Sequence, residues 1–115
     1  MNDKPHLDEE ALAELKDVME DEFEVLIHTY IGDSVDRLAS IRDALEEGNA
    51  DALVKAAHSF KGSSINIGAP RLGVLCLEVE NAGREGRLAE AGSFVEEIDS
   101  EFRHVRSMLE RILES

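Results

Sequence analysis

Residues 88–112 read LAEAGSFVEEIDSEFRHVRSMLERI, and this stretch decides the fold class. Its main apolar residues follow one another at steps of four and three: Ala91, Val95, Ile98, Phe102, Val105, Leu109 and Ile112. That spacing forms one apolar seam along a helix, as in helices that pack nearly antiparallel to their neighbours. We therefore predict a long final helix, beginning near Leu88, that buries this seam.

The segments before it also have helical signals. Asp8 is a candidate N-cap for a short first helix with apolar residues at helical spacing: Ala11, Leu12, Leu15, Val18 and Met19. Glycine and proline positions suggest the boundaries of three further helices. These are predicted from about Asp21 to Gly48, over about 50–66, and from Pro70 to Gly83 or Gly86.

No segment alternates polar and apolar residues with the period of a strand over a useful length. The predicted fold is all-α, an antiparallel up-down-up-down four-helix bundle with a short additional N-terminal helix that caps one end. With 115 residues the chain has the length of one domain. We expect residues 1–7 to be a polar N-terminal tail and residues 8–115 to form that single domain.

The charge excludes two classes of partner. The chain has 26 acidic and 12 basic side chains, a net charge of −14, which argues against nucleic acid and anionic membranes. Residues 50–90 contain five of each sign, so this segment is the neutral part of an acidic protein. Cys76 is the only cysteine, and no apolar signal segment or membrane span is evident. We expect a cytoplasmic monomer in which Cys76 is buried.

His58 is the candidate functional residue. On a helical wheel the apolar side chains of residues 53–67 share one face, and His58 lies about 140° from its centre. Lys61 and Gly62 follow at positions i+3 and i+4, so they are its neighbours on the next turn. A glycine inside a helix costs about 1 kcal/mol relative to alanine, which suggests that another molecule approaches closely there.

The histidine lies in a short signature, Ala57-His58-x-x-Lys61-Gly62-Ser63-Ser64, followed by Gly68-Ala69. This signature resembles that of the histidine phosphotransfer (HPt) domain, and the length and helix layout agree over essentially the whole chain. The resemblance implies a phosphoryl carrier on a four-helix bundle. His58 would accept the group, with Lys61 as charge partner and Gly62 giving steric access.

The resemblance also implies the partners. These are the receiver domains of a hybrid sensor kinase and of a response regulator, and the receiver supplies the Mg²⁺, so the carrier itself needs no cofactor. The chain has no glycine-rich phosphate loop followed by Lys-Ser/Thr, which favours a carrier over a kinase. The alternative is a non-catalytic helical adaptor that binds partner helices through its apolar stripe.

The geometry of the predicted hairpin places Glu80 near His58. If the helices on either side of the turn centred on Ala69 run antiparallel, residues 58 and 80 lie level, since each is 11 positions from the turn. The Glu80 carboxylate could then accept the Nδ1 proton of His58 and leave Nε2 free to attack. The alternative is an ordinary exposed glutamate.

A docking surface is predicted around the histidine. Val54 and Ile65 fall about 100° and 120° from the apolar face of their helix, which leaves them exposed without a packing role. The bases Lys55 and Arg84 could meet the acidic rim of a receiver pocket.

The remaining histidines are assigned no function. Glu101 and His104 have the spacing of a Glu-x-x-His metal motif, but a di-iron bundle needs a second copy and the chain has one. We therefore predict no metal site, and we expect His6 and His28 to be structural or solvated.

Overall fold

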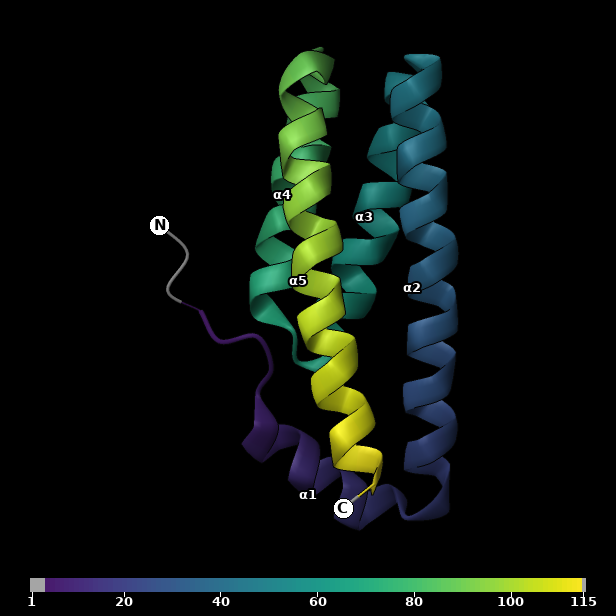
Figure 1. The fold of residues 1–115 in the computed structure, drawn as a ribbon, viewed down its shortest axis with the longest axis vertical. Coiled ribbons are helices and arrows are strands. Elements are labelled where there is room, and N and C mark those ends of the chain that lie inside the picture. Colours follow the sequence, from purple (N-terminus) through teal and green to yellow (C-terminus); the bar gives the residue numbers. More distant parts are fainter. Residues whose placement is uncertain (1–3, 115) are drawn as a thin grey trace.

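The structure, a computed structural model, describes residues 4–114, and Figure 1 shows the helices that these residues form. They are α1 (Glu9–Met19), α2 (Asp21–Glu47), α3 (Ala50–Ile67), α4 (Pro70–Arg84) and α5 (Leu88–Glu114). No strand occurs within this range, so the prediction of an all-helical bundle is confirmed. The first three residues of the expected tail lie outside the described residues.

Capping residues set the helix boundaries, as the sequence predicted. Gly48 and Gly68 end α2 and α3 in the left-handed conformation, with φ of 69° and 87°. The Asn49 side chain accepts a hydrogen bond from the backbone N–H of Ala52 at the start of α3. Pro70 occupies the first turn of α4. These signals are local, which is why the predicted boundaries agree closely with the structure.

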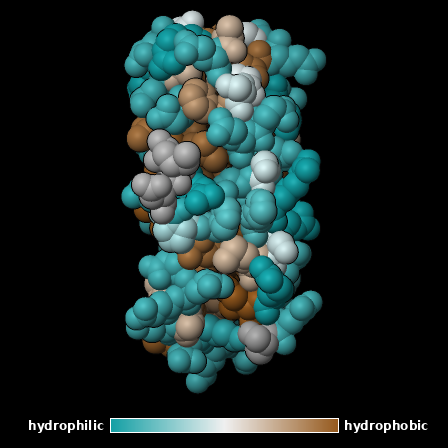
Figure 2. All heavy atoms as spheres, turned by 60° about the vertical axis from the view of Figure 1, so that its left-hand side comes forward, coloured by the Kyte–Doolittle hydropathy of each residue, from teal (hydrophilic) through white to brown (hydrophobic). Residues whose placement is uncertain are grey.

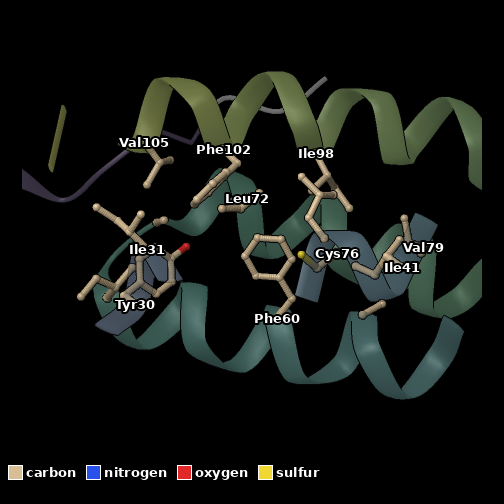
Figure 3. Packing of buried hydrophobic residues seen from close by; sticks show 14 of the residues in the cluster. Tyr30, Ile31, Ile41, Phe60, Leu72, Cys76, Val79, Ile98, Phe102 and Val105 are labelled. Atoms are coloured by element: carbon tan, nitrogen blue, oxygen red, sulfur yellow. The ribbon is translucent and has the colours of Figure 1, made fainter. Parts of the chain in front are cut away.

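Helices α2 to α5 run side by side along the long axis, and α1 crosses the lower end of the bundle (Figure 1). In Figure 3, Phe60 of α3 points toward α5, and the rings of Phe60 and Phe102 meet edge-on at a centroid distance of 6.0 Å. Cys76 is buried beside Phe60, as predicted. The seam of α5 is buried from Ala91 to Leu109, and Ile112 is half-buried. The core is therefore the one that the four-three spacing predicted.

The apolar residues of α1 are less buried than their spacing predicted. Leu12 is buried, whereas Val18 is exposed. Six residues separate them, which places Val18 about 120° around the helix from Leu12. Because α1 crosses the end of the bundle, only one side of it meets the other helices. The prediction that Val18 belongs to the apolar stripe is therefore wrong.

Residues 4–7 differ from the expected polar tail because they pack against the bundle. Leu7 is buried in the core. His6 Nδ1 lies 2.6 Å from Oε2 of Glu101, a buried carboxylate that would be costly without a partner. The carbonyl of Lys4 accepts a hydrogen bond from Arg71. His6 is thus structural, and this segment extends the ordered domain toward the N-terminus.

Two glycines of α4 let α3 approach closely. A Cβ atom built on Gly83 would lie 2.8 Å from Cγ2 of Val54, and one on Gly73 would lie 2.8 Å from Cγ1 of Ile65. Val54 is therefore half-buried over α4, and the prediction that it is exposed without a packing role is wrong. Ile65 also rests on a glycine, but it stays largely exposed. A wheel of α3 alone could not reveal these contacts, because the glycines belong to the neighbouring helix.

The surface is mostly hydrophilic. On the face in Figure 2, hydrophobic residues form small groups that are separated by hydrophilic ones. The large apolar side chains that are exposed among the described residues are Val18, Val25, Val35, Ile65 and Leu77. Within residues 4–114, none of the helices combines the length and the apolar composition needed to cross a bilayer.

Candidate functional site

His58 projects from the outer face of α3, and its side chain is 64% exposed. Its Nδ1 atom lies 3.2 Å and 3.3 Å from the two carboxylate oxygens of Glu80 on α4. A carboxylate can only accept a hydrogen bond, so Nδ1 carries the proton. In the neutral ring, Nε2 is then the nitrogen with a free lone pair. The hairpin geometry had predicted this pair, and the structure brings the two side chains together.

Glu80 is buried, with 4% of its surface exposed, and its carboxylate has three side-chain partners. Lys61 Nζ lies 2.8 Å from Oε1, and Arg84 Nη2 lies 2.9 Å from Oε2. Burial alone would raise the pKa of this carboxyl, but the hydrogen bonds from Lys61, Arg84 and His58 outweigh burial and lower the pKa from 4.5 to about 2. Glu80 is therefore ionised at neutral pH. The alternative of an ordinary exposed glutamate does not describe it.

The cluster of His58, Lys61, Glu80 and Arg84 has an excess of positive charge. Two cations and one carboxylate leave one net positive charge beside the imidazole. Lys61 is half-buried and bound to Glu80, whereas the sequence suggested only that it lies beside the histidine. A positive site next to an exposed nucleophile suits an anionic group such as a phosphoryl group.

Gly62 lies in the middle of α3 and is exposed. A Cβ atom built there meets no heavy atom within 4 Å, in contrast to Gly73 and Gly83. Packing within the protein therefore does not require glycine at this position. The open space beside His58 is consistent with the close approach of a partner.

We expect alanine at two of these glycines to change stability in opposite directions. Gly62→Ala should raise the free energy of unfolding by up to about 1 kcal/mol, because alanine favours the helix and meets no neighbour. Gly83→Ala should lower it by about 1–3 kcal/mol, because Val54 and α4 must move apart. Urea unfolding measured by circular dichroism would give both values. A loss of stability in Gly62→Ala would show that Gly62 has an internal role.

The other predicted docking residues take different places. Lys55 forms an exposed ion pair with Asp51, one turn earlier on α3, and is not part of the cluster. Arg84 was predicted to contact a partner, but it also binds Glu80. The sequence contained a signal for this contact, because Glu80 and Arg84 are four residues apart on one helix. The ion pair between Lys61 and Glu80 joins two helices and had no comparable local signal.

A second histidine cluster lies where the N-terminal segment meets α5. The rings of His6 and His104 stack with centroids 4.9 Å apart, and His6 also binds Glu101. In the part of the chain that the structure describes, no three His, Cys, Asp or Glu side chains are grouped so that they could hold a metal ion. His28 lies 3.7 Å from Glu24 on the surface of α2.

Comparison with known proteins gives this geometry a context. The family model of the Hpt domain matches residues 25–115. The chain belongs to the Hpt domain family. The matched range contains most of α2, all of α3 to α5, and therefore every residue of the cluster around His58. Membership of this family gives the chain a phosphotransfer role in a phosphorelay.

Two solved structures resemble this Hpt domain. Histidine-containing phosphotransfer protein B (HptB) from Pseudomonas aeruginosa PAO1 is 46% identical, with 93% of each chain covered and a TM-score of 0.88. A putative histidine-containing phosphotransfer protein from rice has a TM-score of 0.83, with 95% of this chain and 82% of the rice chain covered. Its identity of 19% supports the fold alone. A search of curated proteins found no match.

Proposed function

We propose that this Hpt protein carries a phosphoryl group on Nε2 of His58 between the aspartates of two receiver domains. The observation that carries the proposal is the exposed imidazole whose Nδ1 is held by a buried carboxylate. That contact selects Nε2 as the nucleophile. The similarity to HptB, a histidine-containing phosphotransfer protein, supports the same chemistry.

The transfer step follows from this arrangement. The Nε2 lone pair attacks the phosphorus of a receiver aspartyl phosphate, so an N–P bond forms as the P–O bond to the aspartate breaks. The aspartate leaves as a carboxylate. The ring keeps its Nδ1 proton and becomes cationic, and the Glu80 carboxylate, 3.2 Å away, stabilises that positive charge. The reverse step passes the group to a second receiver.

The neighbouring residues assist this step without forming bonds to phosphorus. Lys61 and Arg84 both bind Glu80, so either cation can face the phosphoryl oxygens while the other stays paired with the carboxylate. Gly62 leaves room for the partner's active site. In this proposal the receiver supplies the Mg²⁺, and the chain acts as a cytoplasmic monomer without autokinase activity. A hybrid sensor kinase is the donor and a response regulator is the acceptor.

Mixing the protein with a ³²P-phosphorylated receiver tests the proposal. We expect the label to move to this chain as acid-labile, base-stable phosphate, and mass spectrometry should locate it on the peptide that contains His58. Incubation with labelled ATP alone should give no label. A non-catalytic adaptor would bind the receiver without acquiring phosphate, and that result would overturn the proposal.

A further inference from the structure

A groove of about 340 Å³ lies between α2 and α5, the two helices that lie in front in Figure 1. Its floor is apolar and is formed by Val35, Leu38 and Ala39 of α2 together with Phe102 of α5. Leu38 and Phe102 are buried, whereas Val35 is 45% exposed. The floor of this α2–α5 groove therefore presents apolar surface to water.

The exposed side of the floor belongs to a second stripe along α2. Gly32, Val35, Ala39 and Arg42 follow one another at steps of three, four and three, and this stripe is centred about 100° from the buried one that contains Leu38. A Cβ atom built on Gly32 meets no heavy atom within 4 Å, so internal packing does not require the glycine, which weakens a helix relative to alanine. Small side chains on this face allow a partner helix to approach α2 closely.

Three arginines border the groove in a protein that has 12 basic and 26 acidic side chains. They are Arg42 of α2 and Arg103 and Arg106 of α5. Asp99 is the only carboxylate among the lining residues, and it lies 2.7 Å from Arg103 and 3.7 Å from Arg42. The lining thus has two net positive charges, in contrast to the acidic protein as a whole.

The glutamates that pair with two of these arginines lie outside the groove. Arg42 is 3.0 Å from Glu96, and Arg106 is 3.5 Å from Glu110. Both glutamates are exposed, and exposed ion pairs contribute little to stability. Carboxylates of a partner can therefore replace them at low cost.

We propose that the α2–α5 groove binds an acidic amphipathic helix of another protein. Apolar side chains of that helix would cover the floor, and its carboxylates would meet the arginines. The stripe from Gly32 to Arg42 is about 15 Å long, which matches about three turns of a helix. A second copy of this chain is a poorer occupant, because a two-fold contact would set the arginines of one groove against those of the other. This role goes beyond the proposed carrier function and does not depend on it.

The groove and His58 lie on opposite sides of α2. Arg37 of α2 donates a hydrogen bond to Ser59, the residue after His58. Val35 and Ala39 are each about 160° around α2 from Arg37. A helix in the groove therefore leaves His58 accessible, so that in the proposed relay the carrier could stay attached to a third protein while a receiver is bound.

Two synthetic peptides of about 20 residues test the proposal. Both are alanine-rich helices with leucine at positions i, i+4 and i+7, and the flanking positions are glutamate in one peptide and lysine in the other. By fluorescence anisotropy we expect the glutamate peptide to bind with a dissociation constant below about 100 μM, at least about fivefold more tightly than the lysine peptide. The net charge of −14 favours the opposite order, so general electrostatic attraction cannot produce this result.

Variants of the protein locate the binding surface. Val35→Asp should raise the dissociation constant of the glutamate peptide about tenfold or more, because it places a carboxylate on the apolar floor. Arg103→Glu should weaken the glutamate peptide at least about threefold and strengthen the lysine peptide. Val18→Asp is the matched control and should stay within about twofold of the parent, since Val18 is 80% exposed but lies on α1 outside the groove. Val35→Asp should also acquire phosphate from a receiver at the parent rate.

Several outcomes would overturn the inference. These are the absence of glutamate-peptide binding, lysine-peptide binding of equal strength, and parent-like affinity in Val35→Asp. Chemical-shift changes confined to residues around His58 would place the peptide on a different surface. A parent dimer in sedimentation that Val35→Asp abolishes would assign the groove to a second copy. Circular dichroism checks folding, and Val35→Gln replaces Val35→Asp if that variant unfolds. Because the peptide assay contains no receiver, its failure would not count against the proposed function.

Discussion

His58→Gln is expected to abolish phosphorylation by a receiver while leaving the fold intact. Glutamine has a polar side chain of similar length, but its amide nitrogen is not a nucleophile. Because the His58 side chain is 64% exposed, the replacement removes little packing, and we expect the free energy of unfolding to stay within about 0.5 kcal/mol. Label transfer from a phosphorylated receiver and thermal unfolding give the two measurements.

The other histidines are the controls for this experiment. His28→Gln and His104→Gln should accept phosphate at the parent rate, since neither histidine has a lysine at i+3, although Gly32 lies at i+4 of His28. His6→Gln should also accept phosphate, although the loss of its contact with Glu101 is expected to lower stability. Label on His58→Gln, or its loss from a folded His28→Gln or His104→Gln protein, would show that a different histidine carries the group.

Glu80→Gln is expected to lower stability and to change how stability depends on pH. At pH 7 the variant loses the anion that pairs with Lys61 and Arg84, and we expect a cost on the order of 1–3 kcal/mol. The folded pKa of Glu80 is lowered from 4.5 to about 2, so its contribution is complete above about pH 4.5 and is lost as pH falls toward 2. The difference in stability between parent and variant should shrink over that window.

Chemical unfolding of both proteins between pH 7 and pH 2 measures this difference. Glu78 is a half-buried glutamate on the same helix, so Glu78→Gln is the matched control. Its free energy of unfolding should differ little from that of the parent at every pH. Nitrogen-15 NMR of the imidazole adds a readout that stability alone does not give, because Glu80→Gln should reduce the share of the tautomer with the proton on Nδ1. A constant difference between parent and Glu80→Gln across the pH range would contradict the assigned pairing.

Much of this fold could be predicted because its signals are local. Caps at Asn49 and Gly68 and the seam of α5 need only the residues around them. Glu80 could be placed beside His58 because a tight turn between antiparallel helices fixes which residues lie level. That inference needed the direction of the two helices but not their rotation or separation.

The residues that prediction misplaced depend on the packing between elements. Val54 looked exposed on its own helix, yet Gly83 on α4 leaves a space that it fills. The ordered segment at His6 and Leu7 depends on a buried carboxylate almost a hundred residues away. Such features follow from the spacing and rotation of whole helices, which a single sequence does not encode locally.

The excess positive charge of the His58 cluster bears on the direction of phosphoryl transfer in the proposed relay. A phosphohistidine that keeps its ring proton has a net charge of about −1, and the cluster supplies one compensating positive charge. Because the anion is balanced by side chains already in place, neither loading nor unloading requires the carrier to rearrange its core. In the proposed relay this balance is the same whichever receiver is bound, so we expect the direction of net transfer to depend on how fast one receiver aspartate is phosphorylated and the other is hydrolysed.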